Sequence, residues 1–177
     1  MGNNLQEFID EFNGGNRAHR YDVQMNWPVA AGGTDTSGIA LNRFFVRSVA
    51  LPASQINPIR IPYRGRVLKY PGDRIFYPWT FRVLDENKGA NRSIWNKFNK
   101  WSNGINDYTE NTHNDVWDSF TTDWTIQQTD ADGDVIKTAK LIDCWPTVIG
   151  PISLDSNAID TLVEFTVTVE YQWAEIT

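Results

Sequence analysis

The sequence predicts a mainly β protein: a small β-barrel or sandwich of two packed antiparallel sheets, with a flanking α-helix and a short N-terminal helix. Two runs of alternating large apolar residues, at 75–83 and 163–173, carry this prediction, because a period of two is typical of half-buried strands. Residues 90–102 instead have the spacing of an amphipathic helix. No linker or repeat interrupts the chain, so residues 1–177 are expected to form a single domain.

The composition argues against several classes of function. Sixteen basic and 22 acidic residues give a net charge of −6, which disfavours binding nucleic acid through basic contacts to phosphate. A single cysteine, Cys144, allows neither an internal disulfide nor a cysteine-rich metal site. The N-terminus lacks the features of a signal peptide and no segment has the length of a membrane span, so synthesis in the cytosol without membrane association is expected.

The first part of the chain is expected to combine a helix, two strands and loops. Four apolar residues at helical spacing predict a short helix over residues 4–12. Alternating apolar residues predict strands over 21–27 and 39–50, on either side of a flexible loop at 28–38. Residues 51–73 hold four prolines and two glycines, which favour a protruding hairpin or loop.

The strand predicted over residues 74–84 has Pro78 at its centre. Proline has no N–H for the strand ladder, so this strand belongs at a sheet edge or contains a bulge. Its large side chains are expected to face one way: Ile75, Tyr77, Trp79, Phe81 and Val83. An apolar edge promotes aggregation unless something covers it, so the pattern predicts a partner for this edge.

The second part is expected to hold the main helix and three more strands. The helix over 90–102 is expected to end at Gly104. Strands are predicted over 117–129 and 135–143, joined by a turn at 130–134.

Residues 144–160 are expected to form an irregular connection to the last strand. That strand has an apolar face comprising Val163, Phe165, Val167, Val169, Tyr171 and Trp173. Trp27, Trp79 and Trp101 are likewise in phase with apolar faces, which places these tryptophans in the core or at an interface rather than on an exposed stacking surface.

Residue types of catalytic and metal sites are scarce. His19 and His113 each lie in a polar segment without a second ligand at metal-binding spacing, and we interpret them as surface residues. Cys144 is interpreted as a core thiol rather than a nucleophile. The acidic run at 130–134 does not match a calcium loop in its glycine and glutamate positions and is interpreted as a hairpin turn. No cofactor, metal or enzymatic activity is therefore expected.

Four stretches occur in a characteristic order along nearly the whole chain. The most distinctive, at 46–86, combines a Leu-Pro turn, an extended basic stretch, a Gly-Asp-Arg triplet, an aromatic residue and a tryptophan within a strand. Those positions are Leu51, Pro52, Gly72, Asp73, Arg74, Phe76 and Trp79. The others are 17–25, the helix with Arg92, Phe98 and Trp101, and "CWPTVIGPISLD" with the last strand. Together they resemble the tail-tube protein family of contractile-tailed bacteriophages; the loops at 28–38 and 106–115 match least.

This resemblance implies a structural assembly protein without a cofactor. Six copies would close into a ring, and rings would stack into a hollow tube that conducts double-stranded DNA without binding it specifically. The implied partners are further copies of the chain, the tail sheath protein, and the baseplate and tube-terminating proteins. The implied location is the virion, after assembly in the host cytoplasm, with no membrane partner.

The resemblance and the charge pattern together give hypotheses for three surfaces. The protruding stretch at 58–70 is expected to stack on an acidic rim of the next ring, through Arg60, Arg64, Arg66 and Lys69. The polar side of the last strand is expected to line the lumen, through Glu164, Thr166, Thr168, Glu170 and Gln172, because such a wall would let a duplex slide. The polar side of the helix is expected to face the sheath through Lys97 and Lys100.

Two alternatives to a phage tail remain open from the sequence. The chain is also compatible with the tube of a bacteriocin or another contractile injection system, in which the cargo differs. A different class of function is a tryptophan-rich carbohydrate-binding β-sandwich, which predicts a monomer whose tryptophan fluorescence shifts when sugars are added. Asp85 and Glu86 are also candidates for a glycosidase pair, although the sequence does not set their separation.

Overall fold

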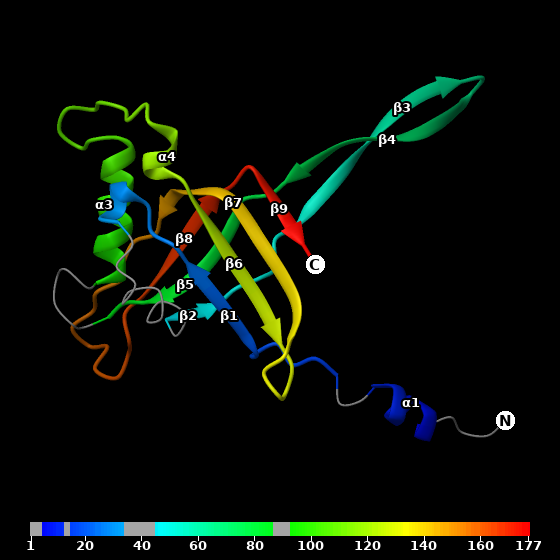
Figure 1. Ribbon diagram of the computed structural model, residues 1–177, viewed down its shortest axis with the longest axis horizontal. Helices are drawn as coiled ribbons and strands as arrows, with labels where there is room; N and C mark the ends of the chain where they lie inside the picture. The colour runs from blue at the N-terminus through cyan, green and yellow to red at the C-terminus, as the bar shows by residue number, and fades with distance from the viewer. Residues whose placement is uncertain (1–4, 13–14, 34–44, 87–92) are drawn as a thin grey trace.

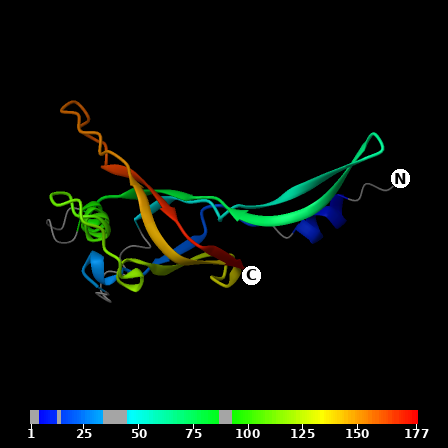
Figure 2. The ribbon, with the colours of Figure 1, turned by 90° about the horizontal axis from the view of Figure 1, so that it is seen from above.

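The computed structural model describes residues 5–12, 15–33, 45–86 and 93–177. Within these residues, seven strands form a curled antiparallel sheet, and a two-stranded hairpin protrudes from it (Figures 1 and 2). The predicted mainly β fold class is therefore confirmed.

The elements follow one another in this order along the chain. The strands are β1 (Tyr21–Met25), β2 (Val46–Ser48), β3 (Ser54–Tyr63), β4 (Arg66–Phe76), β5 (Trp79–Leu84), β6 (Thr122–Thr129), β7 (Val135–Ile149), β8 (Glu164–Glu170) and β9 (Trp173–Ile176). The helical segments are α1 (Leu5–Phe12), the single 3-10 turn η1 (Val29–Ala31), α3 (Ile94–Ile105) and the short α4 (Trp117–Phe120).

The long strand β7 curls the sheet because it belongs to both of its halves. Its first part pairs with β6 and β9, and its last part pairs with β8, in the order β1-β6-β7-β8-β5-β2. Asp143 lies where the register between β6 and β7 shifts, with a φ of 53°, and its N–H donates to the Asp123 carboxylate at 3.2 Å. A bulge of this kind bends a strand and folds the sheet into a half-barrel.

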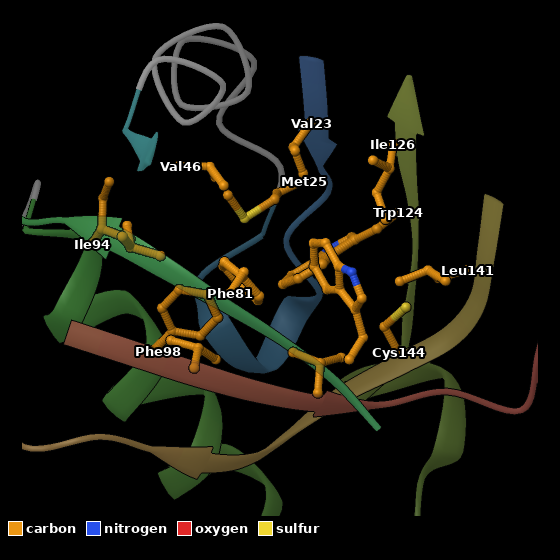
Figure 3. Close-up of a cluster of buried hydrophobic side chains, with 14 of the residues drawn as sticks. Val23, Met25, Val46, Phe81, Ile94, Phe98, Trp124, Ile126, Leu141 and Cys144 are labelled. Carbon is orange, nitrogen blue, oxygen red and sulfur yellow. The ribbon is translucent and has the colours of Figure 1, made fainter. Parts of the chain in front are cut away.

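An aromatic cluster fills the inside of the half-barrel and is closed by α3. Figure 3 shows Phe81, Phe98 and Trp124 directed into the same interior, with Leu141 and Cys144 beside them. The Trp124 indole N–H donates to the Asn26 carbonyl at 2.8 Å, so its polar atom is satisfied. The predicted burial of Trp27, Trp79 and Trp101 is confirmed. Burial of each large apolar side chain in such a core stabilises the folded state by about 1.5–3 kcal/mol.

The helix α3 begins at a side-chain cap and runs past the glycine predicted to end it. Ser93 accepts a hydrogen bond from the Asn96 N–H at 3.2 Å, and the Asp85 carboxylate accepts one from the Ser93 hydroxyl at 3.0 Å. The prediction that Gly104 ends the helix is wrong. A Cβ at this position would lie 2.7 Å from the Ala30 Cβ, so the close approach of η1 requires glycine inside the helix. Residues 90–92 of the predicted helix lie outside the described residues.

The predicted strand at 74–84 is two strands. Tyr77 and Pro78 separate β4 from β5, and the side chains of Ile75 and Tyr77 are each 44% exposed. The common buried face is limited to Trp79, Phe81 and Val83. The strand β5 lies between β8 and β2, so of the two alternatives inferred from Pro78, an edge or a bulge, the edge does not hold where β2 pairs with β5, at Val83 and Arg82. The proline instead marks the point where the chain returns from the hairpin to the sheet.

Three other strand boundaries differ from the prediction. The segment predicted as a strand from 117 begins with α4, and β6 starts at Thr122. The strand β7 continues to Ile149, into the predicted irregular connection. Of the strand predicted at 39–50, β2 covers Val46–Ser48, while 39–44 lie outside the described residues.

The last predicted strand is divided where it follows the bend of β7. The strand β8 ends at Glu170, and the Gln172 N–H donates to the Ile142 carbonyl at 3.0 Å before β9 begins. The buried residues of β8 have odd numbers, but in β9 the residue opposite the buried Leu141 is Ala174. The alternation of side chains has therefore shifted by one residue at this bend. Trp173 is consequently 44% exposed, and its predicted place in the apolar row is wrong.

Candidate assembly surfaces

The basic residues predicted for stacking lie on the hairpin formed by β3 and β4. The two strands turn at Arg64 and Gly65, whose φ angles are 45° and 80°, as a two-residue hairpin turn requires. Figure 1 shows this hairpin extending far from the half-barrel, which confirms the predicted protrusion. Arg60 and Lys69 are directly opposite each other, and both are exposed. Like charges in this arrangement destabilise a strand pair, so the hairpin itself gains nothing from placing them there.

The two faces of the hairpin differ in character. Opposite residues share a face, and successive residues alternate, so Arg60 and Lys69 lie on one face together with Val67 and several prolines. The other, the apolar face of the hairpin, carries Ile59, Ile61, Tyr63, Leu68 and Tyr70, all exposed. Arg66 is opposite Tyr63, and therefore lies at the tip of this apolar face. The sequence analysis missed this face, although the alternation in "INPIRIPY" is a signal for it.

The motif residues gather at the neck of the hairpin, where it joins the half-barrel. The Trp79 indole N–H donates to the Ala50 carbonyl at 2.6 Å, and Pro52 nearby is buried. Arg74 donates to the Ser54 hydroxyl at 2.9 Å across the two strands, while Phe76 packs edge-on against Tyr171 with ring centroids 6.0 Å apart. Leu51 and Asp73 are exposed. The motif thus fixes how the hairpin leaves the sheet.

Gly72 lies at the bulge of the hairpin, and its replacement is expected to loosen β3 and β4. A Cβ there would lie 2.6 Å from the Asn57 carbonyl oxygen and 3.1 Å from Ile59 Cγ1. We therefore expect Gly72→Ala to destabilise the hairpin by about 1–3 kcal/mol. Faster hydrogen exchange of the β3 and β4 amides would show this, with the exposed neighbour variant Asp73→Ala as control. Equal exchange in the two variants would contradict the prediction.

The side chains predicted to line the lumen lie on the outer surface of β8. Alternation is as predicted, with Phe165, Val167 and Val169 buried. Glu164, Thr166, Thr168 and Glu170 point outward from the half-barrel, while Gln172 lies in the bend before β9. The Thr168 hydroxyl is 3.0 Å from the Thr80 hydroxyl of β5.

Two arginines that the sequence analysis did not assign lie beside this row. Arg47 forms an ion pair with Glu164, and Arg82 is directly opposite Thr166. The surface formed by β2, β5 and β8 therefore carries one carboxylate–guanidinium pair, Arg47 with Glu164, and a second arginine beside the threonines. The pairings of β2 with β5 and of β5 with β8 depend on long-range contacts, so the sequence held no local signal for this surface.

The two lysines predicted to face the sheath lie on the side of α3 near η1. The Lys97 ammonium lies over the Trp27 ring, 5.4 Å from its centroid, and the side chain is partly buried. Lys100 is exposed, and its ammonium approaches Gly32 closely. Lys97 thus stabilises the contact of α3 with Trp27, which lies just before η1, and Lys100 is the more exposed of the two.

The remaining candidate residues have structural surroundings. His19 and His113 are exposed, as interpreted from the sequence, and Cys144 is fully buried, where desolvation raises the pKa of its thiol far above the ordinary value. The turn at 130–134 is a hairpin turn in which the Asp130 carboxylate accepts hydrogen bonds from the N–H groups of Asp132 and Asp134 at 2.9 and 2.8 Å.

The described residues form neither a metal site nor a membrane-spanning helix. Nowhere in the described ranges do three His, Cys, Asp or Glu side chains converge as metal ligands would. Among the described helices, none is long and apolar enough to cross a membrane.

Comparison with known proteins identifies related sequences over most of the chain. The family model for phage tail tube proteins matches residues 16–175. The tail tube protein of Serratia phage KSP90 is 30% identical over 158 residues, which cover 88% of this chain and 85% of the relative.

Solved structures share the fold at much lower identity. The sheath-tube complex of an extracellular contractile injection system, PVC, contains a chain with a TM-score of 0.63 and 16% identity, covering 99% of both chains. A chain in the tube-terminating cap of the anti-feeding prophage has a TM-score of 0.64 and 16% identity, covering 92% of this chain and 90% of its own. The chain therefore shares its fold with these two chains over almost its whole length.

Proposed function

Because this chain belongs to the phage tail tube protein family, we propose that it is the structural subunit of the inner tube of a contractile tail. Six copies close into a ring, the rings stack into a hollow tube, and double-stranded DNA passes through the lumen during ejection. The long exposed hairpin carries this proposal, because a two-stranded hairpin with apolar residues on one face is marginally stable alone and needs a covering surface. The subunit acts by assembling and not by catalysis.

Free strand edges support the closure of a ring. The strand β1 lies at one end of the sheet and the three-residue β2 at the other. Among the described residues, β2 pairs with β5 only at Val83 and Arg82, so much of β5 is left without a strand on that side. Pairing of these edges between neighbouring copies removes them from solvent, and repetition of one heterologous contact closes a ring.

The basic cluster supports the stacking of rings. Arg60 and Lys69 present two adjacent positive charges on an arm that reaches beyond the half-barrel, with Arg64 and Arg66 at its tip. In a chain of net charge −6, the next ring offers acidic surface to such an arm. Complementary charge of this kind fixes register and speeds association.

The outer surface of β8 is the wall that we assign to the lumen. The threonines offer neutral hydroxyl groups, and the arginines beside Glu164 and Thr166 balance the two glutamates. A duplex meets a surface of nearly zero net charge there, so phosphates are neither held nor strongly repelled.

Reversing one charge in this wall is expected to slow DNA passage. Glu170 is the better position, because Glu164 already forms an ion pair with Arg47. In particles assembled with Glu170→Lys, each ring gains positive charge, and we expect ejection to slow several-fold at low salt and to recover as salt displaces the phosphate contacts. Glu170→Gln, which removes the charge without reversing it, should eject DNA at nearly the normal rate. Normal ejection by the lysine variant at low salt would count against the lumen assignment.

The other partners follow from the same proposal. The exposed Lys100 on α3, with Lys97 beside it, is offered to an acidic sheath subunit, and the ends of the tube meet the baseplate and tube-terminating proteins. Assembly in the host cytoplasm and incorporation into the virion complete the scheme. The related solved complexes contain tubes together with a sheath or a terminator, which is why these partners are chosen.

Two alternatives are less well supported. A tube of a contractile injection system has the same fold, but the relative with 30% identity comes from a phage. A carbohydrate platform requires exposed tryptophans in a row, whereas Trp27, Trp79 and Trp101 are buried. Asp85 caps α3, which gives this half of the suggested glycosidase pair a structural role.

Sedimentation velocity over a concentration series tests the proposal against a monomeric binding module. We expect a shift from monomer to rings and larger species as the concentration rises. A single monomeric species throughout, with a tryptophan fluorescence shift on adding a glycan, would instead favour the sugar-binding class.

A further inference from the structure

The helix α1 presents an apolar face that its own chain leaves exposed. Leu5, Phe8, Ile9 and Phe12 are between 52% and 60% exposed, and the rings of Phe8 and Phe12 stack with centroids 5.4 Å apart. A helix of eight residues is marginal in water by itself, because few of its hydrogen bonds offset the cost of nucleation. Its amphipathic pattern therefore indicates a docking segment whose partner surface lies elsewhere.

The apolar face of the hairpin is the complementary surface in size. Three of its five exposed side chains are on β3 and two are on β4. The three on β3, from Ile59 to Tyr63, span about 13 Å at the rise of a strand. The helix α1 spans about 11 Å from Leu5 to Phe12 at the rise of a helix. Each surface is thus long enough to cover the other.

The two surfaces also carry opposite charge. The sequence of α1 contains three acidic residues and no basic one: Glu7, Asp10 and Glu11. The hairpin from Ser54 to Phe76 contains five basic residues and one acidic residue, a net charge of +4, and two of the five, Arg60 and Lys69, lie on its opposite face. Arg66 shares the apolar face, and Arg64 lies at the adjoining turn. Opposite charge around two apolar faces favours their association and fixes its orientation.

The two surfaces lie at the same end of the molecule but are separated within one chain. In Figure 2 the hairpin and α1 both extend to the same side of the half-barrel. Figure 1 shows that they point away from each other, so they do not touch within one chain. A rotation about a ring axis keeps the same end of every copy uppermost, so the α1 of one copy can meet the hairpin of its neighbour.

We propose that α1 packs on the apolar face of the hairpin of the adjacent copy in the same ring. This inference rests on the proposed ring assembly and adds the contact that joins its subunits. It leaves the opposite face, with Arg60 and Lys69, available to the next ring, so that the two faces of one hairpin make two different contacts. It also explains why the hairpin and α1 are both apolar and exposed in the single chain.

Disulfide trapping between copies tests the contact directly. The full chain carries Phe8→Cys on α1 together with Leu68→Cys on the apolar face of the hairpin, and the assemblies are oxidised and separated on a non-reducing gel. Each copy then has one cysteine on each partner surface, so we expect a ladder that continues beyond dimers. The matched control pairs Phe8→Cys with Val67→Cys, one residue away on the opposite face, and should give no ladder. The native Cys144 is fully buried and does not take part.

The outcomes separate this inference from the proposed function. If electron microscopy shows rings or tubes but the Leu68 pair gives no ladder, or the Val67 pair gives an equal one, the contact is overturned and the assembly stands. If the unmodified chain forms no ring at any concentration, the proposed function and the contact both fail. As a second variant, Phe8→Asp should raise the concentration needed for assembly by about tenfold or more, because it removes an apolar contact from each subunit interface. Unchanged assembly by this variant would also overturn the contact.

Discussion

Reversing the two opposed charges of the hairpin, by Arg60→Glu with Lys69→Glu, is expected to stop tube growth while leaving the subunit folded. The two side chains are exposed and directly opposite each other. The double variant replaces a positive pair with a negative pair, so the repulsion within the hairpin and its effect on hairpin stability stay similar. What changes is the contact with the acidic surface of the next ring, because the reversed hairpin places negative charges against it and like charges brought together cost several kcal/mol. Because every subunit repeats the contact, even this penalty prevents a long stack.

The control variants separate stacking from folding. Arg60→Glu alone turns the like-charge pair into an opposite-charge pair, so it should stabilise the hairpin and still weaken stacking. Lys137→Glu changes an exposed charge on the half-barrel and should leave tube length unaffected. Tube length in electron micrographs and circular dichroism of the subunit are the two measurements. Normal tubes from the double reversal would remove the basic cluster from the account.

The second large effect concerns the core. Trp124 is fully buried among Trp79, Phe81, Phe98 and Trp101, with ring centroids between 5.7 and 6.3 Å from its own. We expect Trp124→Ala to lower the free energy of unfolding by about 3–5 kcal/mol, the usual cost of removing a buried aromatic side chain. Since whole domains are stable by about 5–15 kcal/mol, this variant would be close to unfolding.

A tryptophan on the surface provides the matched comparison. Trp173 begins β9 and is 44% exposed, so Trp173→Ala should cost less than about 1 kcal/mol by the ordinary range for surface substitutions. Urea unfolding followed by near-ultraviolet circular dichroism measures both variants. Equal losses of stability would mean that the aromatic cluster is not the centre of the core.

The sequence was sufficient for the fold class because the strands have one buried and one exposed face. Phe165, Val167 and Val169 alternate with polar residues, and this pattern survives in β8 without change. The protruding hairpin was also predictable, because the prolines and glycines of 51–73 leave few ways to build a packed strand. The family motif then falls at the neck that anchors this hairpin.

Strand boundaries were harder to predict where tertiary structure bends the sheet. The bulge at Asp143 depends on its hydrogen bond to Asp123, twenty residues away, and it shifts the phase of the strand opposite. Trp173 continues the period of two in the sequence and therefore gave no sign of this shift. Similarly, the position of β5 between β8 and β2 rests on pairings with segments that are distant in the sequence. Pro78, the local signal, suggested an edge or a bulge.

The candidate surfaces show the same division. The basic cluster and the alternating row on β8 were visible as local patterns, and the side chains of both sets are exposed or half-buried. The arginines beside β8 were not visible, because Arg82 and Arg47 reach that surface only through the pairing of three strands. The cation–aromatic contact of Lys97 with Trp27 likewise joins residues that are distant in sequence.

Electron microscopy of the purified protein over a concentration series is the most direct test of the central claim. We expect six-fold rings that stack, as the concentration rises, into hollow tubes with the hairpin between adjacent rings and the outer surface of β8 facing the lumen. Isolated monomers at every concentration, even after a baseplate seed is added, would contradict it.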